Sequence, residues 1–354
     1  MTHLPPDTTG LLHSSPEADG EETLRRGTAL VDPLLREAVG RLHPSMATVC
    51  RYHLGWDTPA ASALPVRTGK RVRAALALLS VRSVGAPEQL AGIAGTAVEL
   101  VHQLSLLHDD IMDGDAERRG QAAAWARFGT GAAVLAGDAL IVQAVRTVVR
   151  AQAPGAQAAT EDLVVTVEAM VDGQAEDLAL EQADLREISA DRYMSMAGGK
   201  TGALFGCAAA LGAVLCQAPE PTVRALRSAG RDLGTAFQIL DDVLGLWGDP
   251  ALTGKPVGGD LRRGKKTLPL ILAARSDTTA GRQLAALVNR SPLPAHRLQD
   301  VMRLLADTGA REYAEAIAAR HMASALTALD EAEVAEDVRT QWHALIGCLS
   351  GRSS

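Results

Sequence analysis

Apolar residues recur at helical spacing along most of this 354-residue chain, and this periodicity constrains the fold more than any other feature. The first such run extends from Leu24 to Leu42. Hydrophobic residues make up 47% of the chain and aromatic residues only 3%, so Ala, Leu and Val must supply most of the core. Because Ala and Leu favour helices over sheets, the sequence predicts an all-α fold with a sizeable buried core.

Gly and Pro divide the periodic pattern into blocks of helical length. The blocks predict helices over residues 28–53, 70–83, 87–112, 131–153, 159–178, 190–215, 222–246, 267–275, 296–308, 310–329 and 331–348, and no strand is predicted. No linker of different composition separates them, so a single helical domain is expected over residues 26–350. Residues 1–25 lack periodicity and are rich in polar residues, Gly and Pro, which predicts a disordered leader or a docking tail.

Charge and composition exclude several functional classes. The net charge is −7 and no basic stretch is interleaved with aromatic residues, so nucleic acid is not expected as a partner. The four cysteines lack the paired short spacing of a zinc site or a disulfide framework. No signal sequence is evident and apolar runs are interrupted before membrane-spanning length, which predicts a cytoplasmic protein without a transmembrane segment.

Two acidic pairs follow strongly apolar helical stretches. Asp109 and Asp110 end the first stretch, and Asp241 and Asp242 end the second. Buried carboxylates need a compensating positive charge, and oxygen ligands suit a hard cation such as Mg²⁺. Asp113 lies one helical turn after Asp109 and shares its face. A lone pair would be read more simply as a solvated helix terminus, but two pairs predict a cavity with Mg²⁺ ions held between two acidic rims.

Cationic residues accompany both acidic pairs, at Lys70, Arg73, Arg118, Arg119, Lys200, Lys255, Lys265 and Lys266. Each of them alone would be read as part of a solvated surface. Together with the acidic pairs they describe a cavity for a polyanion, because Arg and Lys grip the phosphate oxygens that Mg²⁺ also bridges. The intervening segments are aliphatic and suit a hydrocarbon tail. The predicted substrate class is therefore an apolar diphosphate.

The chain resembles the trans-isoprenyl diphosphate synthase family, also called polyprenyl synthetases, and is most similar to bacterial geranylgeranyl diphosphate synthases. The resemblance rests on motifs in family order: GKRVR at 69–73, HQLSLLHDDIMDGDAERRG at 102–120, AGDAL at 136–140, GQAED at 173–177, GGKTGALF at 198–205, FQILDDVLG at 237–245 and GKPVGGDLRRGKKTLPL at 254–270. It implies a helical bundle of the isoprenoid synthase type with a central apolar cavity. It also implies a homodimer.

The resemblance implies a Mg²⁺-dependent condensation of isopentenyl diphosphate with an allylic diphosphate. The implied metal ligands are Asp109, Asp110, Asp113, Asp241 and Asp242. The implied allylic diphosphate-binding residues are Arg118, Lys200, Thr201, Gln238, Lys255 and Lys265, of which Lys200, Thr201 and Gln238 also assist catalysis. The implied isopentenyl diphosphate-binding residues are Lys70, Arg73, His102 and Arg119. Departure of diphosphate leaves an allylic cation that the isopentenyl double bond attacks, and the departing diphosphate then takes up a proton.

Product length is expected to depend on the cavity floor, where the resemblance places Leu104 and Ser105 about one turn before Asp109. Family members with short products often carry an aromatic ring in this region, and neither residue here is aromatic. The resemblance therefore implies a linear product of twenty carbons, geranylgeranyl diphosphate.

The chain departs from the family pattern in the second acidic motif. Its fifth position is Gly245, where the family usually has Asp. Asp249 could supply a carboxylate if the helix continued that far, but its place between Gly and Pro is more typical of a turn.

Two alternatives remain open at this point. A class I terpene cyclase shares the helical fold and the first acidic motif, but it would have no use for the four isopentenyl diphosphate-binding positions. A non-catalytic or partner-dependent subunit would explain Gly245, although such a chain would be expected to lose several of the site residues that are present here.

Overall fold

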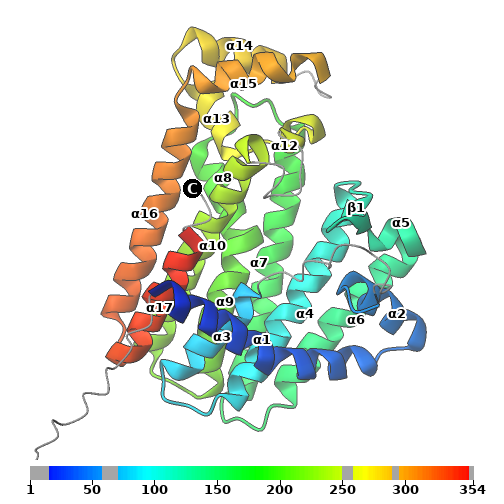
Figure 1. The fold of residues 1–354 in the computed structure, drawn as a ribbon, viewed down its shortest axis with the longest axis vertical. Coiled ribbons are helices and arrows are strands. Elements are labelled where there is room, and N and C mark those ends of the chain that lie inside the picture. The colour runs from blue at the N-terminus through cyan, green and yellow to red at the C-terminus, as the bar shows by residue number, and fades with distance from the viewer. Residues whose placement is uncertain (1–15, 58–70, 249–257, 289–294, 351–354) are drawn as a thin grey trace, which may run out of the picture.

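The computed structural model describes residues 16–57, 71–248, 258–288 and 295–350, and within them almost all regular structure is helical (Figure 1). The helices are α1 (Pro16–Gly40), α2 (Pro44–His53), α3 (Val72–Arg82), α4 (Gln89–Met112), α5 (Ala124–Phe128), α6 (Thr130–Val149), α7 (Ala156–Gln182), α8 (Ala190–Ala197), η1 (Gly198–Gly202), α9 (Ala203–Leu215), α10 (Glu220–Trp247), α12 (Gly259–Arg263), α13 (Leu268–Arg275), α14 (Thr279–Val288), η2 (Ala295–Arg297), α15 (Leu298–Ala306), α16 (Ala310–Glu331) and α17 (Glu336–Ser350). The predicted all-α, single-domain fold is confirmed.

The long helices α4, α7, α10 and α16 run along the bundle, α1 crosses one end, and α14 and α15 lie across the other (Figure 1). Apolar side chains form two main core clusters. The first joins α1, α3, α4, α6 and α9, and the second joins α8, α13, α14, α15 and α16. Helix α10 belongs to both, because Leu226 and Leu233 pack in the first cluster and Ile239 and Leu246 in the second.

A π-helical segment, η1, interrupts the run from α8 to α9 and carries Lys200 and Thr201. Such π turns are rare and occur often at functional sites. Helix α7 approaches this segment so closely that only glycine fits at position 173: a Cβ atom there would lie 2.2 Å from the backbone nitrogen of Lys200. The close approach brings the polar residues of α7 next to those of η1.

The observed helices differ from the predicted ones at the N-terminal end. Helix α1 begins at Pro16, so the predicted disordered leader is helical over residues 16–25, where Leu24 is buried in the core; residues 1–15 lie outside the described part. The predicted helix 28–53 is two helices, because the chain breaks before Pro44, which occupies the first turn of α2. Helices α5, α12 and α14 were not predicted.

The prediction of no strand was wrong. Residues Glu117–Arg118 (β1) and Gln121–Ala122 (β2) form an antiparallel hairpin directly after the first acidic motif. Arg119 and Gly120 connect the strands and both have positive φ, which matches the twist of a two-residue hairpin loop. Two residues per strand are too few to give an alternating hydrophobic pattern, so the sequence carries no strand signal here.

Three helical segments are long and apolar enough to cross a membrane, contrary to the expectation that apolar runs would be too short. In Gln89–Met112 and Ala190–Leu215, 67% and 78% of the apolar window is buried inside the protein. Only 39% of the window in Thr130–Val149 is buried, so α6 leaves an apolar face exposed.

Replacing Gly173 by Ala is expected to lower the free energy of unfolding by about 1–3 kcal/mol, because the added methyl group overlaps the backbone of η1. Gly198→Ala is the matched control in the same contact region, because a Cβ atom there meets nothing within 4 Å. Urea unfolding of both variants tests the packing. Equal stabilities would show that α7 and η1 can separate without cost.

Candidate active site

A cavity of about 590 Å³ opens between α4, α7, η1, α9 and α10. The residues that line the cavity change from charged to apolar along the helix axes. Asp109 on α4 and Asp113 directly after this helix line one end, and Ser105 and Val101 on α4 follow one and two turns before Asp109. Helix α7 repeats the order, with Asp177 at the polar end and aliphatic residues further back. The cavity therefore joins a charged mouth to a deep apolar part.

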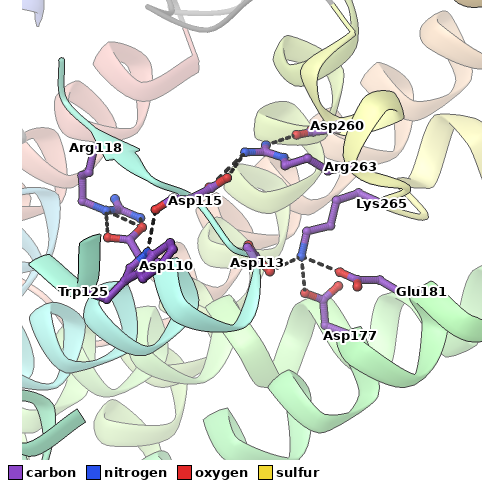
Figure 2. Close-up of polar contacts among 10 residues, drawn as sticks. All are labelled: Asp110, Asp113, Asp115, Arg118, Trp125, Asp177, Glu181, Asp260, Arg263 and Lys265. Carbon is purple, nitrogen blue, oxygen red and sulfur yellow. Dashed lines mark hydrogen bonds and ion pairs between the residues drawn. The ribbon is translucent and has the colours of Figure 1, made fainter. Parts of the chain in front are cut away.

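Lys265 connects three carboxylates at the mouth (Figure 2). Its Nζ lies 2.7 Å from Oδ1 of Asp113, 2.7 Å from Oε1 of Glu181 and 3.4 Å from Oδ2 of Asp177. Burial alone would lower the pKa of Lys265, but the three carboxylates raise it above its usual range. The ammonium group therefore stays charged and links α4, α7 and the segment that follows α12.

Lys200 extends this network from η1. Its Nζ lies 2.6 Å from Oδ2 of Asp177, and both Asp109 and Asp177 raise its pKa against the effect of burial. Burial raises the pKa of Asp109, and Lys200 and Lys265 oppose that rise while Asp113 adds to it. Cations and carboxylates thus alternate across the mouth.

The second carboxylate of the first pair has a different environment. Asp110 is buried and accepts hydrogen bonds from Nε of Arg118 at 2.8 Å and from Nη2 at 2.6 Å (Figure 2). The prediction assigned Asp110 to the metal and Arg118 to the allylic diphosphate, but here they engage each other. Arg118 still lines the cavity, whereas both oxygens of Asp110 are occupied by its guanidinium.

Asp242, the second carboxylate of the second acidic pair, also forms hydrogen bonds with protein groups. Asp242 accepts hydrogen bonds from the Tyr193 hydroxyl at 2.6 Å, the Leu268 backbone N–H at 3.0 Å and Nε2 of Gln238 at 3.1 Å. Burial raises its pKa to about 7, although the tyrosine and backbone donors oppose the rise. Asp242 thus ties α8, α10 and α13 together and also lines the cavity, and Asp241 is exposed at the cavity; that both bind the metal stays a prediction.

Thr201 and Gln238 lie together as predicted. The Thr201 hydroxyl donates to Oε1 of Gln238 at 2.6 Å, and Nε2 of the same amide donates to Asp242. The amide is therefore fixed at both ends. The Thr201 hydroxyl uses its hydrogen in this contact, so its oxygen can present lone pairs to the cavity that both residues line.

Arg73 and His102 line another part of the cavity. The Arg73 guanidinium lies over the Phe205 ring at 4.6 Å, and its buried Nε has no hydrogen-bond partner among the described residues. Burial lowers the pKa of Arg73 to about 10, with Glu99 opposing the shift. Burial and the neighbouring Arg73 and Arg119 hold the pKa of His102 well below its usual range. A buried guanidinium with an unused donor is suited to an anion.

The carboxylate donors fit a divalent cation that is shared with a phosphate ligand. Among the residues that the structure describes, no three His, Cys, Asp or Glu side chains lie close enough to hold an ion alone. Mg²⁺ usually keeps several waters and binds one or two carboxylates together with substrate phosphates. Asp109 and Asp113 on one side and Asp241 on the other offer oxygen donors to such an ion.

The predicted floor residues Leu104 and Ser105 both line the cavity. The Ser105 hydroxyl donates to the backbone carbonyl of His102 at 2.9 Å, so its polarity is satisfied within its own helix. The lining continues past them to Val101 on α4, Ile141 on α6 and Val167 on α7. The floor residues therefore do not end the apolar part.

The remaining predicted residues fall into two groups. Arg119 lies in the hairpin turn near His102 but does not line the cavity. Lys70, Lys255 and Asp249 lie outside the described residues.

Sequence reasoning missed the contacts made by Asp177, Glu181, Tyr193, Asp260 and Arg263, of which the last two form an ion pair with each other. The motifs GQAED and DLRRGKK contain three of these residues and were recognised, but their spacing carried no indication of which lysine each carboxylate would contact. Glu181 and Tyr193 had no motif to single them out.

Comparison with known proteins gives consistent matches. The Polyprenyl synthetase family model matches residues 58–305. A geranylgeranyl diphosphate synthase of Mycobacterium tuberculosis is 39% identical over 329 residues, which cover 92% of this chain and 93% of that protein. The crystal structure of a polyprenyl synthetase from Streptomyces coelicolor has a TM-score of 0.86 at 38% identity, covering 93% of this chain and 98% of that one. A polyprenyl synthase from Caulobacter crescentus, complexed with calcium and isoprenyl diphosphate, has a TM-score of 0.83 at 28% identity, covering 99% of this chain and all of that one.

Tyr193→Phe is expected to lower the free energy of unfolding by about 1–2 kcal/mol, because the buried Asp242 carboxylate loses a donor. The exposed Tyr313→Phe is the matched control and should change stability by less than about 0.5 kcal/mol. Urea unfolding at neutral pH measures both. If the two variants were equally stable, the contact between Tyr193 and Asp242 would not support the site.

Proposed function

The chain belongs to the polyprenyl synthetase family and is a prenyltransferase, and on that premise we propose that it joins isopentenyl diphosphate to an allylic diphosphate with the help of Mg²⁺. One observation carries the proposal: a single cavity combines carboxylates and lysines at its mouth, a buried Arg73 with an unused donor, and an aliphatic interior. A substrate that satisfies all three parts is an isoprenoid diphosphate.

The metal would be held by Asp109 on α4, by Asp113 directly after this helix and by Asp241 on α10. When bound, Mg²⁺ supplies Lewis-acid stabilisation of the charge on the allylic diphosphate. Calcium in the Caulobacter relative supports a divalent cation in this family, and the all-oxygen donor set favours Mg²⁺ here.

The protein's own residues account for the other steps. Lys200 and Lys265 neutralise negative charge as diphosphate leaves the allylic substrate. The oxygens of Thr201 and Gln238, fixed by their mutual hydrogen bond, stabilise the allylic cation in a site with little water. Arg73 and His102 hold isopentenyl diphosphate so that its double bond meets that cation. The departing diphosphate accepts the proton that the new cation releases, and no protein nucleophile is required.

Product identification tests this function. The purified chain is incubated with Mg²⁺, isopentenyl diphosphate and dimethylallyl, geranyl or farnesyl diphosphate, and the products are identified by chromatography and mass spectrometry. Linear prenyl diphosphates are expected. Cyclic hydrocarbons formed from one allylic substrate alone would instead indicate a cyclase, and activity only after addition of a second chain would indicate a partner-dependent subunit.

The proposed product is geranylgeranyl diphosphate. The supporting observation is that the apolar lining continues beyond Ser105 to Val101 without an aromatic ring on that face of α4.

Ser105→Phe should shorten the main product by at least one five-carbon unit, because the ring would fill the cavity one turn below Asp109. Ser105→Ala is the matched control and should leave product length unchanged, because it removes only a hydroxyl that is bonded within the helix. Mass spectrometry of the products distinguishes them. Twenty-carbon products from both variants would place the floor elsewhere.

We further propose a homodimer. Among the described residues, all exposed large apolar side chains except Tyr313 lie on α4, α6 and α7, at Met112, Val134, Leu135, Val142, Val149, Val164, Val165 and Val171. Met112 and Val171 also line the cavity, but the other six lie on α6 and α7, which pack against each other, and exposed apolar side chains gathered in this way are typical of an interaction surface. A second copy of the chain would also cover the apolar face of α6 without a membrane, in agreement with the proposed cytoplasmic location.

Placing Glu at both Leu135 and Val142, which lie seven residues apart on one face of α6, should convert the dimer to monomers. Tyr313→Glu is the control, because it adds the same charge at an exposed apolar residue on α16. Light scattering after size-exclusion chromatography gives the masses. An unchanged mass for the double variant would exclude this face as the interface.

A further inference from the structure

Phe205 is a fully buried aromatic residue near the start of α9. The Arg73 guanidinium lies over its ring, with 4.6 Å between the guanidinium carbon and the ring centroid. The same ring packs against Phe237 of α10, and the two ring centroids are 5.5 Å apart. Phe205 does not line the cavity itself, but both of these partners do.

The Arg73 guanidinium depends on this ring because it has few polar partners. Within the described part of the chain, no acceptor binds its buried Nε. Glu99 attracts Arg73 and opposes the lowering of its pKa by burial. However, Oε1 of Glu99 is already contacted by Nη1 of Arg71 at 3.3 Å and by Nε2 of Gln103 at 2.6 Å. A contact with a ring face uses none of the guanidinium N–H donors, so these donors remain available for an anion.

Helix α10 fixes the position of the ring. A Cβ atom at Gly234 would lie 2.7 Å from Cβ of Phe205 and 2.9 Å from its Cγ, so only glycine allows α10 to come this close. Phe237 follows about one helical turn later and packs against the ring from the same helix. A ring that is enclosed in this way cannot change its rotamer without moving α10. Phe205 is therefore a rigid support.

A role in core packing explains the burial of Phe205 but not its contact with a cation. Two other aromatic residues, Tyr193 and Trp342, are among the largest fully buried side chains, and both donate a hydrogen bond from a polar group. Phe205 has no polar group, so only its π face can bind a polar partner. Moving a guanidinium out of water is costly, and an aromatic face offsets more of this cost than an aliphatic side chain would.

We propose that Phe205 is a positioning residue for isopentenyl diphosphate. It acts through Arg73, because the ring holds the guanidinium at the cavity wall before the substrate binds and leaves its donors free for the diphosphate. Holding a side chain in advance lowers the entropy cost of binding. The ring also supports Phe237, which directly precedes Gln238, so it connects the isopentenyl diphosphate site to a residue that faces the allylic cation. The inference rests on the proposed function, because it adds a positioning residue to the same site.

Fluorination of the ring tests this role with little change in its shape. Phenylalanines with one, two and three fluorine atoms are placed at position 205 of the full-length chain, because fluorine withdraws the negative charge of the π face that attracts a cation. The KM for isopentenyl diphosphate should rise with each fluorine, by about 5-fold or more in total. The KM for farnesyl diphosphate and kcat should stay within about twofold, because the ring contributes to the binding of one substrate only.

The same fluorinated series at Phe128 is the matched control. Phe128 also lies next to an arginine, Arg127, but neither residue lines the cavity. Both KM values should therefore be unchanged across this series.

A double-mutant cycle shows whether Phe205 acts through Arg73. Phe205→Leu should lower kcat/KM for isopentenyl diphosphate by about 5- to 30-fold in the natural sequence. In the Arg73→Gln background it should lower kcat/KM by less than about twofold, because the cation that the ring holds is absent. Melting temperatures separate loss of folding from loss of binding. If Phe205→Leu does not fold, the fluorinated series still decides, because it keeps the ring in place.

Two results would overturn the inference. A KM for isopentenyl diphosphate that stays constant across the fluorinated series at position 205 would show that the π face does not contribute. An equal loss from Phe205→Leu with and without Arg73 would show that the ring acts by packing alone. Failure of the natural sequence to form any linear prenyl diphosphate is a different result, because it would contradict the proposed function itself.

Discussion

The structure depends on accommodating buried carboxylates at the mouth of a cavity whose deeper part is apolar. Removing such a group from water costs several kcal/mol unless an opposite charge lies close by. Lys265 and Lys200 provide that charge, and their contacts with Asp113 and Asp177 bring α4, α7, η1 and the segment after α12 to one point. In the proposed function, Asp113 binds the metal ion, and Lys200 and Lys265 bind phosphate. One set of ion pairs thus prepares both halves of a diphosphate site.

The two carboxylates of each acidic pair make different contacts. Neighbouring residues on a helix point about 100° apart, so the two carboxylates of a pair have different surroundings. Asp109 and Asp241 line the cavity, whereas the following residue in each pair is held by protein donors: Asp110 pairs with Arg118, and Asp242, which also lines the cavity, accepts three protein donors. The second members hold the hairpin and Gln238 in place, so they act on the chemistry through the residues that they position.

The sequence predicted the elements that have a local signal. The long amphipathic helices α4 and α10 agree with prediction to within two residues at each end, and Asp109, Lys200 and Gln238 line the cavity as expected. The break before Pro44 had a recognisable signal that was overlooked. The two-residue strands and the π turn have none. Lys265 contacts carboxylates that are distant in sequence, and Asp260 approaches Gly245 from another helix. Only the packing of the helices determines these contacts.

The most direct test of the central claim, that the carboxylates at the mouth serve a cation shared with diphosphate, is the Mg²⁺ dependence of farnesyl diphosphate binding. Isothermal titration calorimetry of the purified chain with farnesyl diphosphate alone, in Mg²⁺ and then in EDTA, measures this without turnover. Binding should be strong with Mg²⁺ and should be lost or greatly weakened with EDTA, because the carboxylates then repel the diphosphate. Equal affinity under both conditions would contradict the claim and would show that the lysines and arginines hold the diphosphate by themselves.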